Sequence, residues 1–482
     1  MASNRRDFLR NTLLGTGMLA TGLASQAAVN NVETNAERSS RKHNQRFNMS
    51  GYAAPKLDKV RIGFVGLGGR GSGAVERMAY IEGVEIVGLC DLYEDRVEKM
   101  EKLLEKHGLP RAKSYSGNKD AWKQMCEDPD IDLIYITTHW ELHTPIAVYS
   151  MENGKHAATE VPAARTIDEC WQLVETSERT RKHCMMLENC CYDFFELLTL
   201  NMARQGFFGE IVHGEGAYIH NLLNENFDKN KYVGMWRLKE NQHRNGNLYP
   251  THGLGPVCQI MDINRGDKME YLTSMSSNDF QMAAKAKELA AKDSFYNEFT
   301  TDHYRGNMNT TTIRTQKGRT IVVQHDVTSP RVYSRIHLVS GTKGMACKYP
   351  DPRVSTSHEW FKPERMKELE EKYTPEIVKR IGEMAKKVGG HGGMDFMMDW
   401  RLIDCLRNGL PLDQDVYDAA LLSCILPLSE KSVANRSNSV DVPDFTNGSW
   451  KTNAPVELTL KGGGTTGVKE SKKVDTTKQL SI

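Results

Sequence analysis

The sequence predicts an α/β protein with two domains: a doubly wound parallel sheet, then an α/β domain with a large, mostly antiparallel open sheet. Three observations predict this class. Apolar runs of strand length alternate with helical segments from residue 60 to residue 189. A glycine-rich turn opens the first of these helices. From residue 209 onward, strands are paired around short turns that contain glycine, as in β-hairpins.

The composition excludes several function classes. The chain has 482 residues, with 63 Lys+Arg against 62 Asp+Glu and a net charge of +1. A nucleic-acid partner is not expected, because phosphate binding needs a basic surface. No apolar run is long enough to span a bilayer, so no stable membrane anchor is expected. The ten cysteines show neither Cys-x-x-Cys nor zinc-like spacing, which predicts buried free thiols.

The first fifty residues differ from the rest of the chain. Arg5 and Arg6 precede Asp7-Phe8-Leu9, a weakly apolar stretch follows over 12–24, and small residues come next. This segment resembles the twin-arginine signal of bacteria. We therefore expect a signal peptide over 1–30, a polar linker over 31–57, and export through the twin-arginine machinery, with a periplasmic location. That machinery moves folded proteins, often with a cofactor in place.

The strand expected over 60–65 leads into a glycine-rich turn that fits G-x-G-x-x-G. A second strand over 84–90 ends at Asp91, twenty residues beyond Gly71. Together these predict a dinucleotide-binding Rossmann domain, which we place over 58–188. The glycines allow a tight turn and close approach to a pyrophosphate, while a carboxylate on the ribose favours NAD over NADP. The expected contacts of this turn and strand with the cofactor are Gly66, Leu67, Gly68, Gly69, Arg70, Gly71 and Asp91.

The alternation continues with helices over 95–107, 122–126, 146–153 and 166–180, and with strands over 131–138 and 183–189. Ligands bind at the carboxyl ends of parallel strands. Two histidines four residues apart lie at one such end, but Pro145 follows and no third ligand has a telling spacing, so no metal is expected. Further cofactor contacts expected at these ends are His139, Trp140, Leu142, His143, Glu160, Val161 and Asn189.

The second domain, placed over 189–445, starts with a strand over 209–218 and has hairpins over 310–327 and 335–348. A tail is expected over 446–482. Tyr249 and His252 flank a proline in a Gly-rich loop, from which both side chains could reach a cleft and move protons. The alternative is a histidine that closes the loop by hydrogen bonding. Arg237 beside Trp236 offers a planar donor and a stacking surface for a sugar.

This layout resembles the Gfo/Idh/MocA oxidoreductase family over residues 58–445. Gly154-Lys155-His156 and Glu160-Val161-Pro162 look like that family's G-K-H and E-K-P stretches. Val161 stands where the dehydrogenases carry lysine, which argues against ordinary alcohol dehydrogenation. Glu-Val-Pro is similar to the glycoside hydrolase family 109 branch, the NAD-dependent alpha-N-acetylgalactosaminidases. Other segments that resemble this branch are 138–143, Met235-Trp236-Arg237, 249–256 and Asn435-Arg436-Ser437.

The resemblance implies hydrolysis of alpha-linked N-acetylgalactosamine by oxidation, elimination, hydration and reduction, with tightly bound NAD regenerated in each turnover. It implies His252 and Tyr249 as catalytic residues, and also Tyr249 at the cofactor. The substrate would be a free or glycan-terminal sugar, and a homodimer is expected from the open sheet. The alternatives are an exported NAD-dependent sugar dehydrogenase and a non-catalytic NAD-bound sugar sensor. The substrate contacts expected are Tyr218, Arg237, Tyr249, Pro250, Thr251, His252 and Tyr333.

Overall fold

The computed structural model describes residues 43–469. The predicted signal peptide therefore lies outside the described residues, as do 31–42 of the predicted linker and 470–482 of the predicted tail. All the elements named here belong to one compact unit, which begins at Asn44.

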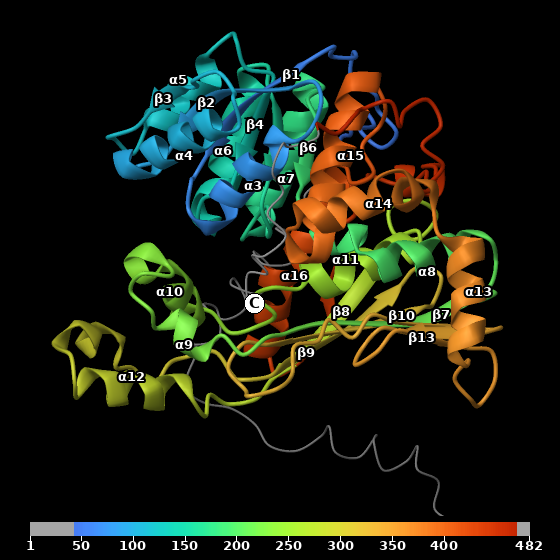
Figure 1. Ribbon diagram of the computed structural model, residues 1–482. Coiled ribbons are helices and arrows are strands. Elements are labelled where there is room, and N and C mark those ends of the chain that lie inside the picture. The colour runs from blue at the N-terminus through green and yellow to red at the C-terminus, as the bar shows by residue number, and fades with distance from the viewer. Residues whose placement is uncertain (1–42, 470–482) are drawn as a thin grey trace, which may run out of the picture. The chain divides into compact units, whose positions relative to one another are not determined.

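The first sheet has six parallel strands in the order β3-β2-β1-β4-β5-β6, which is the Rossmann order (Figure 1). Its central strands are almost fully buried, as expected for a parallel sheet covered on both faces. The predicted parallel sheet is confirmed. The strands are β1 (Val60–Val65), β2 (Val84–Cys90), β3 (Lys113–Tyr115), β4 (Leu133–Ile136), β5 (His156–Thr159) and β6 (Cys184–Met186).

The helices between these strands follow the predicted alternation. The helix predicted over 166–180 begins with a capping box: the Thr166 side chain accepts a hydrogen bond from the Glu169 amide, and the Glu169 side chain accepts one from the Thr166 amide. The elements are α3 (Gly69–Ala79), α4 (Glu94–Lys106), α5 (Ala121–Glu127), the 3-10 turn η1 (Trp140–Leu142), α6 (His143–Glu152), α7 (Ile167–Thr180) and the 3-10 turn η2 (Asn189–Tyr192).

The second sheet has eight strands in the order β13-β12-β11-β7-β10-β9-β8-β14. All neighbours are antiparallel except β7 and β10, which run parallel because the connection between them crosses over. A mostly antiparallel sheet is thus confirmed. Its strands are β7 (Ile211–Ile219), β8 (Met269–Ser276), β9 (Asn309–Thr315), β10 (Thr320–Asp326), β11 (Leu338–Gly341), β12 (Met345–Cys347), β13 (Arg353–Ser355) and β14 (Val440–Asp441).

Three helices cover one face of this sheet: α8 (Phe194–Arg204), α11 (Thr251–Ile260) and α16 (Val416–Ala434) (Figure 1). Helix α16 also packs on α7 and β6 of the first sheet. One hydrophobic core therefore runs from β4, through α7 and α16, to β10. This shared core fixes the carboxyl ends of the first sheet above the helix-covered face of the second.

The Gly-rich loop predicted around His252 is wrong, because residues 251–260 form helix α11. The glycines serve close packing instead of a turn. A Cβ on Gly253 would lie 2.2 Å from the Ala217 amide nitrogen of β7, and one on Gly255 would lie 2.9 Å from Cγ of Glu188. Residue 252 is consequently held in the first turn of a helix that is pressed against the sheet.

The remaining elements are insertions and connections. The charged stretch over 365–387 forms two helices with a break at Thr374-Pro375. These elements are α9 (Leu223–Asn226), η3 (Val233–Met235), α10 (Trp236–His243), α12 (Met282–Ala290), η4 (Ser294–Phe299), α13 (Pro363–Tyr373), α14 (Glu376–Val388), η5 (His391–Gly393), α15 (Met394–Asn408) and η6 (Ser449–Lys451).

Both ends of the described chain pack on this body. Near the start, the Met49 amide donates to the Tyr417 hydroxyl at 3.2 Å, so this part of the predicted linker is not a free spacer. Near the end, Thr466 accepts from Trp400 Nε1 at 3.1 Å, and Val468 bridges Ile81. Part of the predicted tail is therefore bound to the first domain.

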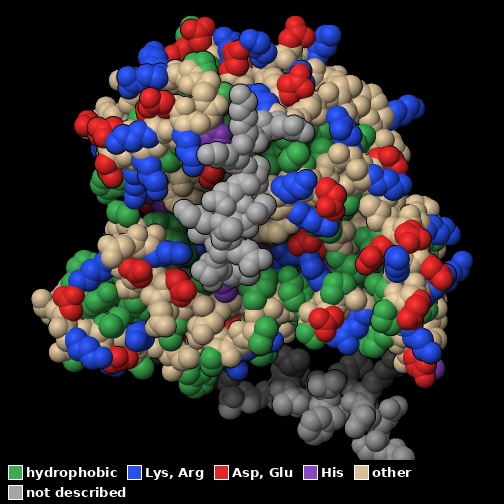
Figure 2. Space-filling view, in the orientation of Figure 1, with side chains coloured by type: hydrophobic (Ala, Val, Ile, Leu, Met, Phe, Trp, Pro, Cys, Tyr) green, Lys and Arg blue, Asp and Glu red, His purple; other side chains and the backbone are tan. Residues whose placement is uncertain are grey.

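The cysteines and the surface agree with the composition. All ten cysteines are free, and all except Cys347 are buried, as predicted. On the face drawn in Figure 2, Lys and Arg side chains are interspersed with Asp and Glu. Within residues 43–469, no helix is long and apolar enough to cross a membrane.

Two adjacent buried histidines predict how stability depends on pH. Burial, assisted by Lys182, lowers the pKa of His183 to about 4, and burial lowers the pKa of His156 well below its ordinary value. Both rings act as acceptors: His183 Nε2 from the Ala54 amide at 3.4 Å, and His156 Nδ1 from the His183 amide at 3.0 Å. Between pH 6.5 and 4 the unfolded chain binds more protons, so stability falls as pH falls.

We expect His183 alone to account for about 3 kcal/mol of unfolding free energy lost by pH 4. Thermal unfolding of wild type and His183→Gln at steps from pH 7 to pH 4 checks this. The unfolding free energy of the variant should fall less steeply with pH, because about one proton fewer is taken up on unfolding. The exposed control His358→Gln should follow wild type. Identical slopes for all three proteins would contradict the assignment.

Candidate active site

The glycine-rich turn after β1 has the shape of a dinucleotide cradle. Gly66 has φ +90°, and a Cβ there would lie 2.8 Å from the Thr137 carbonyl oxygen. A Cβ on Gly71 would lie 1.9 Å from the Gly66 carbonyl oxygen, so this glycine lets α3 pack on the strand. A Cβ on Gly69 would have no neighbour within 4 Å, and one on Gly68 would meet only Nη1 of Arg96, at 3.8 Å. Backbone at the start of α3 is thus accessible to a phosphate, and the fold fits the cofactor.

Asp91 lies at the end of β2, as predicted. Its carboxylate accepts from the Leu67 amide at 2.7 Å and from the Tyr93 amide at 3.0 Å. Arg96 lies 3.4 Å from the same carboxylate. The acid therefore joins the glycine turn to the second strand, in the place where a Rossmann domain binds the adenosine ribose.

Arg70 and the ends of β5 and β6 are linked by ion pairs. Arg70 binds Glu160 through Nη2 at 2.5 Å and Asp395 through Nη1 at 2.8 Å. Asn189 Nδ2 donates to the other oxygen of Asp395 at 2.5 Å. Three expected cofactor contacts from separate loops are therefore joined, and α15 supplies the joining carboxylate. Val161 is buried beside Glu160, so an apolar side chain follows the ion-paired carboxylate at the end of β5.

Residues 139–143, which follow β4, join two loops and pack against Tyr249. Both ring nitrogens of His143 face carbonyl oxygens, Nδ1 that of Pro162 at 2.8 Å and Nε2 that of Thr138 at 3.0 Å. Its ring therefore holds two loops together, and a direct role at the cofactor stays a prediction. Trp140 is buried and stacks on Tyr249 with 5.8 Å between ring centroids. His139 is partly exposed, and Leu142 ends η1.

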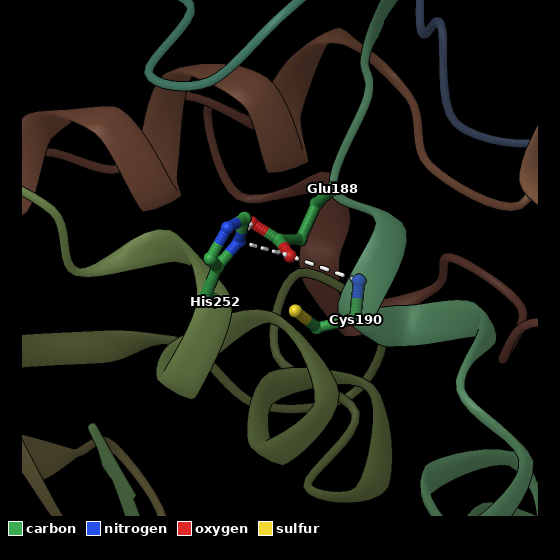
Figure 3. Close-up of side chains that lie close together, drawn as sticks. All are labelled: Glu188, Cys190 and His252. Carbon is green, nitrogen blue, oxygen red and sulfur yellow. Dashed lines mark hydrogen bonds and ion pairs between the residues drawn. The ribbon is translucent and has the colours of Figure 1, made fainter. Parts of the chain in front are cut away.

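His252 is paired with a carboxylate that the sequence interpretation missed. Its Nδ1 lies 2.8 Å from Oε1 and 3.0 Å from Oε2 of Glu188, a fully buried residue after β6 (Figure 3). Glu188 also accepts from the Cys190 amide at 3.1 Å. An acceptor at Nδ1 fixes the proton there and leaves Nε2 as the reactive nitrogen. Among residues 43–469, no group bonds to Nε2 of His252.

The charge of Glu188 is stabilised by this pairing. Burial opposes ionisation of the carboxyl group, but the attraction of His252 and the hydrogen bonds that it receives hold the pKa of Glu188 below its ordinary value. An ionised Glu188 in turn stabilises a protonated His252. The pair is therefore suited to taking up and returning a proton.

Aromatic rings surround His252. The ring centroid of Tyr249 is 4.9 Å from that of His252, and the centroid of Tyr218, on β7, is 5.4 Å away. Tyr333 lies 6.4 Å from Tyr218, with His220 between them at 5.0 Å from Tyr333. Two of the expected substrate contacts thus adjoin the expected catalytic histidine, and a third, Tyr333, lies next to Tyr218. Pro250 and Thr251 are buried at the start of α11 and support this arrangement.

The surroundings of Tyr249 keep its phenol protonated. Burial, reinforced by Tyr218, raises the pKa of Tyr249 well above its ordinary value, although Arg237 opposes the shift. The phenol stays protonated at neutral pH, so its hydroxyl donates a hydrogen bond. Tyr249 is therefore suited to be a donor and not a base.

Arg237, from the first turn of α10, closes the aromatic cluster. Its guanidinium lies 5.1 Å from the ring centroid of Tyr249 and 5.8 Å from that of Trp140, and Nη1 donates to the Tyr232 hydroxyl at 2.9 Å. A positive, planar group among rings offers hydrogen bonds and stacking to a sugar. Trp236 packs edge-on against Trp140 at 5.3 Å.

Among residues 43–469, Glu188, Cys190 and His252 form a cluster that could hold a metal ion, since their possible ligand atoms lie within 4.8 Å of one another (Figure 3). These atoms already have partners. Glu188 is bonded to His252, and Arg335 Nη1 lies 3.2 Å from Cys190 Sγ, which places a positive charge at the sulfur. The expectation of no metal stays a prediction.

Sequence reasoning missed Glu188, His220 and Tyr232 as members of the site. The sequence could have indicated Glu188, because this residue lies beside Asn189 at the end of a parallel strand, where ligands bind. His220 follows Tyr218 by two residues, and Tyr218 donates to or accepts from its Nδ1 at 3.0 Å. Tyr232 had no sequence signal, since its place depends on the turn η3 before α10.

The family models divide the chain as the fold does. Residues 60–188 match the oxidoreductase family with an NAD-binding Rossmann fold, and residues 192–452 match the C-terminal domain of glycosyl hydrolase 109. The first domain is thus an NAD-binding domain.

Curated relatives cover most of this chain. Glycosyl hydrolase family 109 protein 1 of Bacteroides fragilis is 52% identical over 417 residues, covering 83% of this chain and 88% of the relative. A protein named alpha-N-acetylgalactosaminidase, from the same species, is 51% identical over 407 residues, covering 83% and 95%. A glycosyl hydrolase family 109 protein of Porphyromonas gingivalis is 50% identical over 436 residues, covering 87% and 90%.

Solved structures share the fold at low identity. An NAD binding oxidoreductase from Klebsiella pneumoniae has a TM-score of 0.59 at 16% identity, covering 80% of this chain and 100% of its own. Levoglucosan dehydrogenase in complex with NADH and levoglucosan has a TM-score of 0.58 with the same identity and coverage. These likenesses confirm the two-domain α/β architecture.

Proposed function

The chain belongs to glycosyl hydrolase family 109 and is a glycoside hydrolase; on that premise we propose that it hydrolyses terminal alpha-linked N-acetylgalactosamine with NAD that stays bound and is regenerated in each turnover. The proposal is supported most directly by the His252–Glu188 pair inside an aromatic cluster. The name of the Bacteroides fragilis relative supports the choice of sugar.

Bound NAD supplies a reversible hydride acceptor, which makes the proton next to an oxidised sugar carbon acidic. The glycine turn and the start of α3 would hold its pyrophosphate, and Asp91 its adenosine ribose. Arg70, Glu160 and Asn189 would hold its nicotinamide half at the ends of β5 and β6.

The protein's own groups would move the protons. Nε2 of His252 would remove the sugar C2 proton as the C1–O bond breaks and the aglycone leaves with the bonding electrons. Water would then add at C1 and His252 would return a proton to C2, while Glu188 stabilises the protonated ring. Tyr249 donates a hydrogen bond to the sugar, and Arg237 offers a charged, planar contact beside it. Tyr218 and Tyr333 line the floor, so the ring of the sugar lies against aromatic surfaces.

A protonated Tyr249 leads to a prediction. Tyr249→Phe removes the donor but keeps the ring, so kcat should fall about tenfold to a hundredfold, the usual range for one catalytic hydrogen bond. Because the pKa of Tyr249 is raised, wild-type activity should show no alkaline limb from this group below pH 10. Rates from pH 6 to pH 10 for both proteins check this, and an alkaline limb that disappears in the variant would contradict it.

The experiment for the function uses 4-nitrophenyl alpha-N-acetylgalactosaminide and protein purified without added NAD. Many turnovers of nitrophenol release, with no accumulation of absorbance at 340 nm, support a hydrolase with an internal cofactor. Stoichiometric NADH would instead indicate a dehydrogenase, and sugar binding without turnover a sensor. A panel of aryl glycosides of both anomers then tests the sugar.

Export is proposed separately, on the Arg5-Arg6 motif and the weakly apolar stretch behind it. A cofactor regenerated in place suits a periplasmic enzyme, since it needs no external NAD pool. Fractionation of cells that express wild type or an Arg5→Lys, Arg6→Lys variant tests the route. Retention of the variant in the cytoplasm is expected, and equal export would contradict the twin-arginine assignment.

A homodimer through the open face of the second sheet is also proposed. On β8, Tyr271 and Met275 are 37% and 66% exposed on the side away from the covering helices. Size-exclusion chromatography with light scattering gives the mass in solution. A dimer that Met275→Glu converts to a monomer supports this face, and a wild-type monomer contradicts it.

A further inference from the structure

We propose that the loop Gly389–Gly393, from the second half of the chain, completes the dinucleotide site, and that His391 contacts the nicotinamide half of bound NAD. Asp395 holds this histidine in place. The inference rests on the proposed use of NAD, but it concerns binding and not turnover.

The loop Gly389–Gly393 lies against the glycine turn after β1. His391 Nδ1 lies 2.8 Å from Oδ2 of Asp395, and Arg70 Nη1 lies 2.8 Å from the same oxygen. Arg70 Nη1 and His391 Nδ1 are themselves 3.3 Å apart. Arg70 belongs to the first turn of α3, at the start of the helix that faces the phosphates. The loop therefore lies directly against the cradle, although more than 300 residues separate them.

His391 lies on the nicotinamide side of the dinucleotide site. Arg70 also binds Glu160 at the end of β5, and Asp395 also binds Asn189 after β6. In the strand order 3-2-1-4-5-6, the adenosine half lies over the first three strands, where Asp91 is, and the second mononucleotide lies over the others. His391 is thus on the nicotinamide side.

The imidazole ring of His391 has one nitrogen free to bind a ligand. The Nδ1 proton of His391 is directed to Asp395, so Nε2 is left to bond to a ligand. The side chain is 56% exposed, whereas Asp395 beneath it is 1% exposed. This repeats the arrangement of His252 on Glu188. A fixed imidazole that is still open on one side suits contact with a ribose hydroxyl or the carboxamide.

The backbone of the loop has an unusual conformation that brings it close to the ion pairs. Five consecutive residues have positive φ, from +91° at Gly389 to +109° at Gly393, with His391 itself at +45°. At Gly390 a Cβ would lie 2.7 Å from Cβ of Asp395 and 3.0 Å from Cδ of Arg77. Glycine is therefore required for the loop to come this close to the ion pairs, and this conformation presents the ring outward.

Asp395 stays ionised beneath the His391 ring. Burial opposes the charge of Asp395, but Arg70, Arg77 and His391 hold its pKa well below the ordinary value, so it is an anion that orients the ring. Charged groups packed on the loop's base are thus Arg70, Arg77, Glu160, Asp395 and Asp399.

The test compares two ligands on one variant. His391→Gln and wild type are freed of nucleotide by dialysis against charcoal, and the affinities for NAD and for ADP are measured by calorimetry. We expect at least tenfold weaker NAD binding in the variant and an ADP affinity within twofold of wild type. The exposed control His358→Gln should match wild type for both ligands.

Unchanged affinity for NAD would overturn the proposal, and so would an equal loss for NAD and ADP, which would indicate a general disturbance of the fold. A second measurement needs no variant. Hydrogen exchange of the peptide over 389–393 in wild type should slow when NAD is added and should not slow with ADP. Failure to cleave galactosaminides would sink the proposed function and leave these binding results standing.

Discussion

Replacing His252 with asparagine is expected to lower kcat on an aryl alpha-N-acetylgalactosaminide by about a thousandfold. Positioned general acid–base groups contribute about 10² to 10⁴ in rate, and the ring of this residue is held through Nδ1 by Glu188, which leaves Nε2 for the substrate. KM should change much less, because the ring contributes little to sugar binding beside the aromatic cluster. Initial rates over a range of substrate concentrations separate the two effects.

Two controls accompany this variant. His358→Gln alters an exposed histidine outside the site and should leave kcat unchanged. The NAD content of purified His252→Asn should equal that of wild type, which shows that the cofactor domain is intact. A variant that retains more than a tenth of the wild-type kcat would remove His252 from proton transfer.

Glu188→Gln should lower kcat about a hundredfold and alter the pH dependence of the reaction. The glutamine keeps a hydrogen-bond acceptor at Nδ1 but removes the charge that stabilises a protonated ring. The acidic side of the pH–rate profile should therefore differ between wild type and variant, because the variant has no ionisable group at this position. Profiles from pH 4.5 to pH 9 measure both changes.

A structural role alone would not move the profile. If Glu188 only supported packing, Glu188→Gln would reduce the rate equally at each pH and lower the melting temperature. Glu178→Gln serves as a control, since this buried carboxylate accepts a hydrogen bond from the Arg46 amide far from the cleft. A profile of wild-type shape in Glu188→Gln would contradict the proposed pairing.

The cofactor domain was predictable because its signals are local. The turn over 66–71 and Asp91 are close in sequence, and Gly66 and Gly71 each have a steric reason to be glycine. The helix predicted over 166–180 likewise depends on neighbouring residues, since its capping box lies within four positions. The boundaries of the signal, linker and tail stay predictions, as do the assigned roles of the site residues.

The catalytic surroundings were less predictable because they depend on contacts distant in sequence. His252 was placed in a loop because Gly253 and Gly255 suggest a turn, whereas both glycines allow α11 to pack on β7 and Glu188. The partner Glu188 is 64 residues away, and only the folded chain shows the pair. His391 had no local signal at all, since its importance comes from Asp395 and Arg70.

The most direct test of the central claim is deuterium incorporation at sugar C2. The enzyme is run to completion on 4-nitrophenyl alpha-N-acetylgalactosaminide in D₂O, and the released sugar is analysed by proton NMR. Proton removal and return at C2 by His252 predicts loss of the C2 proton signal in each product molecule, while the C3 proton remains. Release of sugar that keeps its full C2 proton signal would contradict the account.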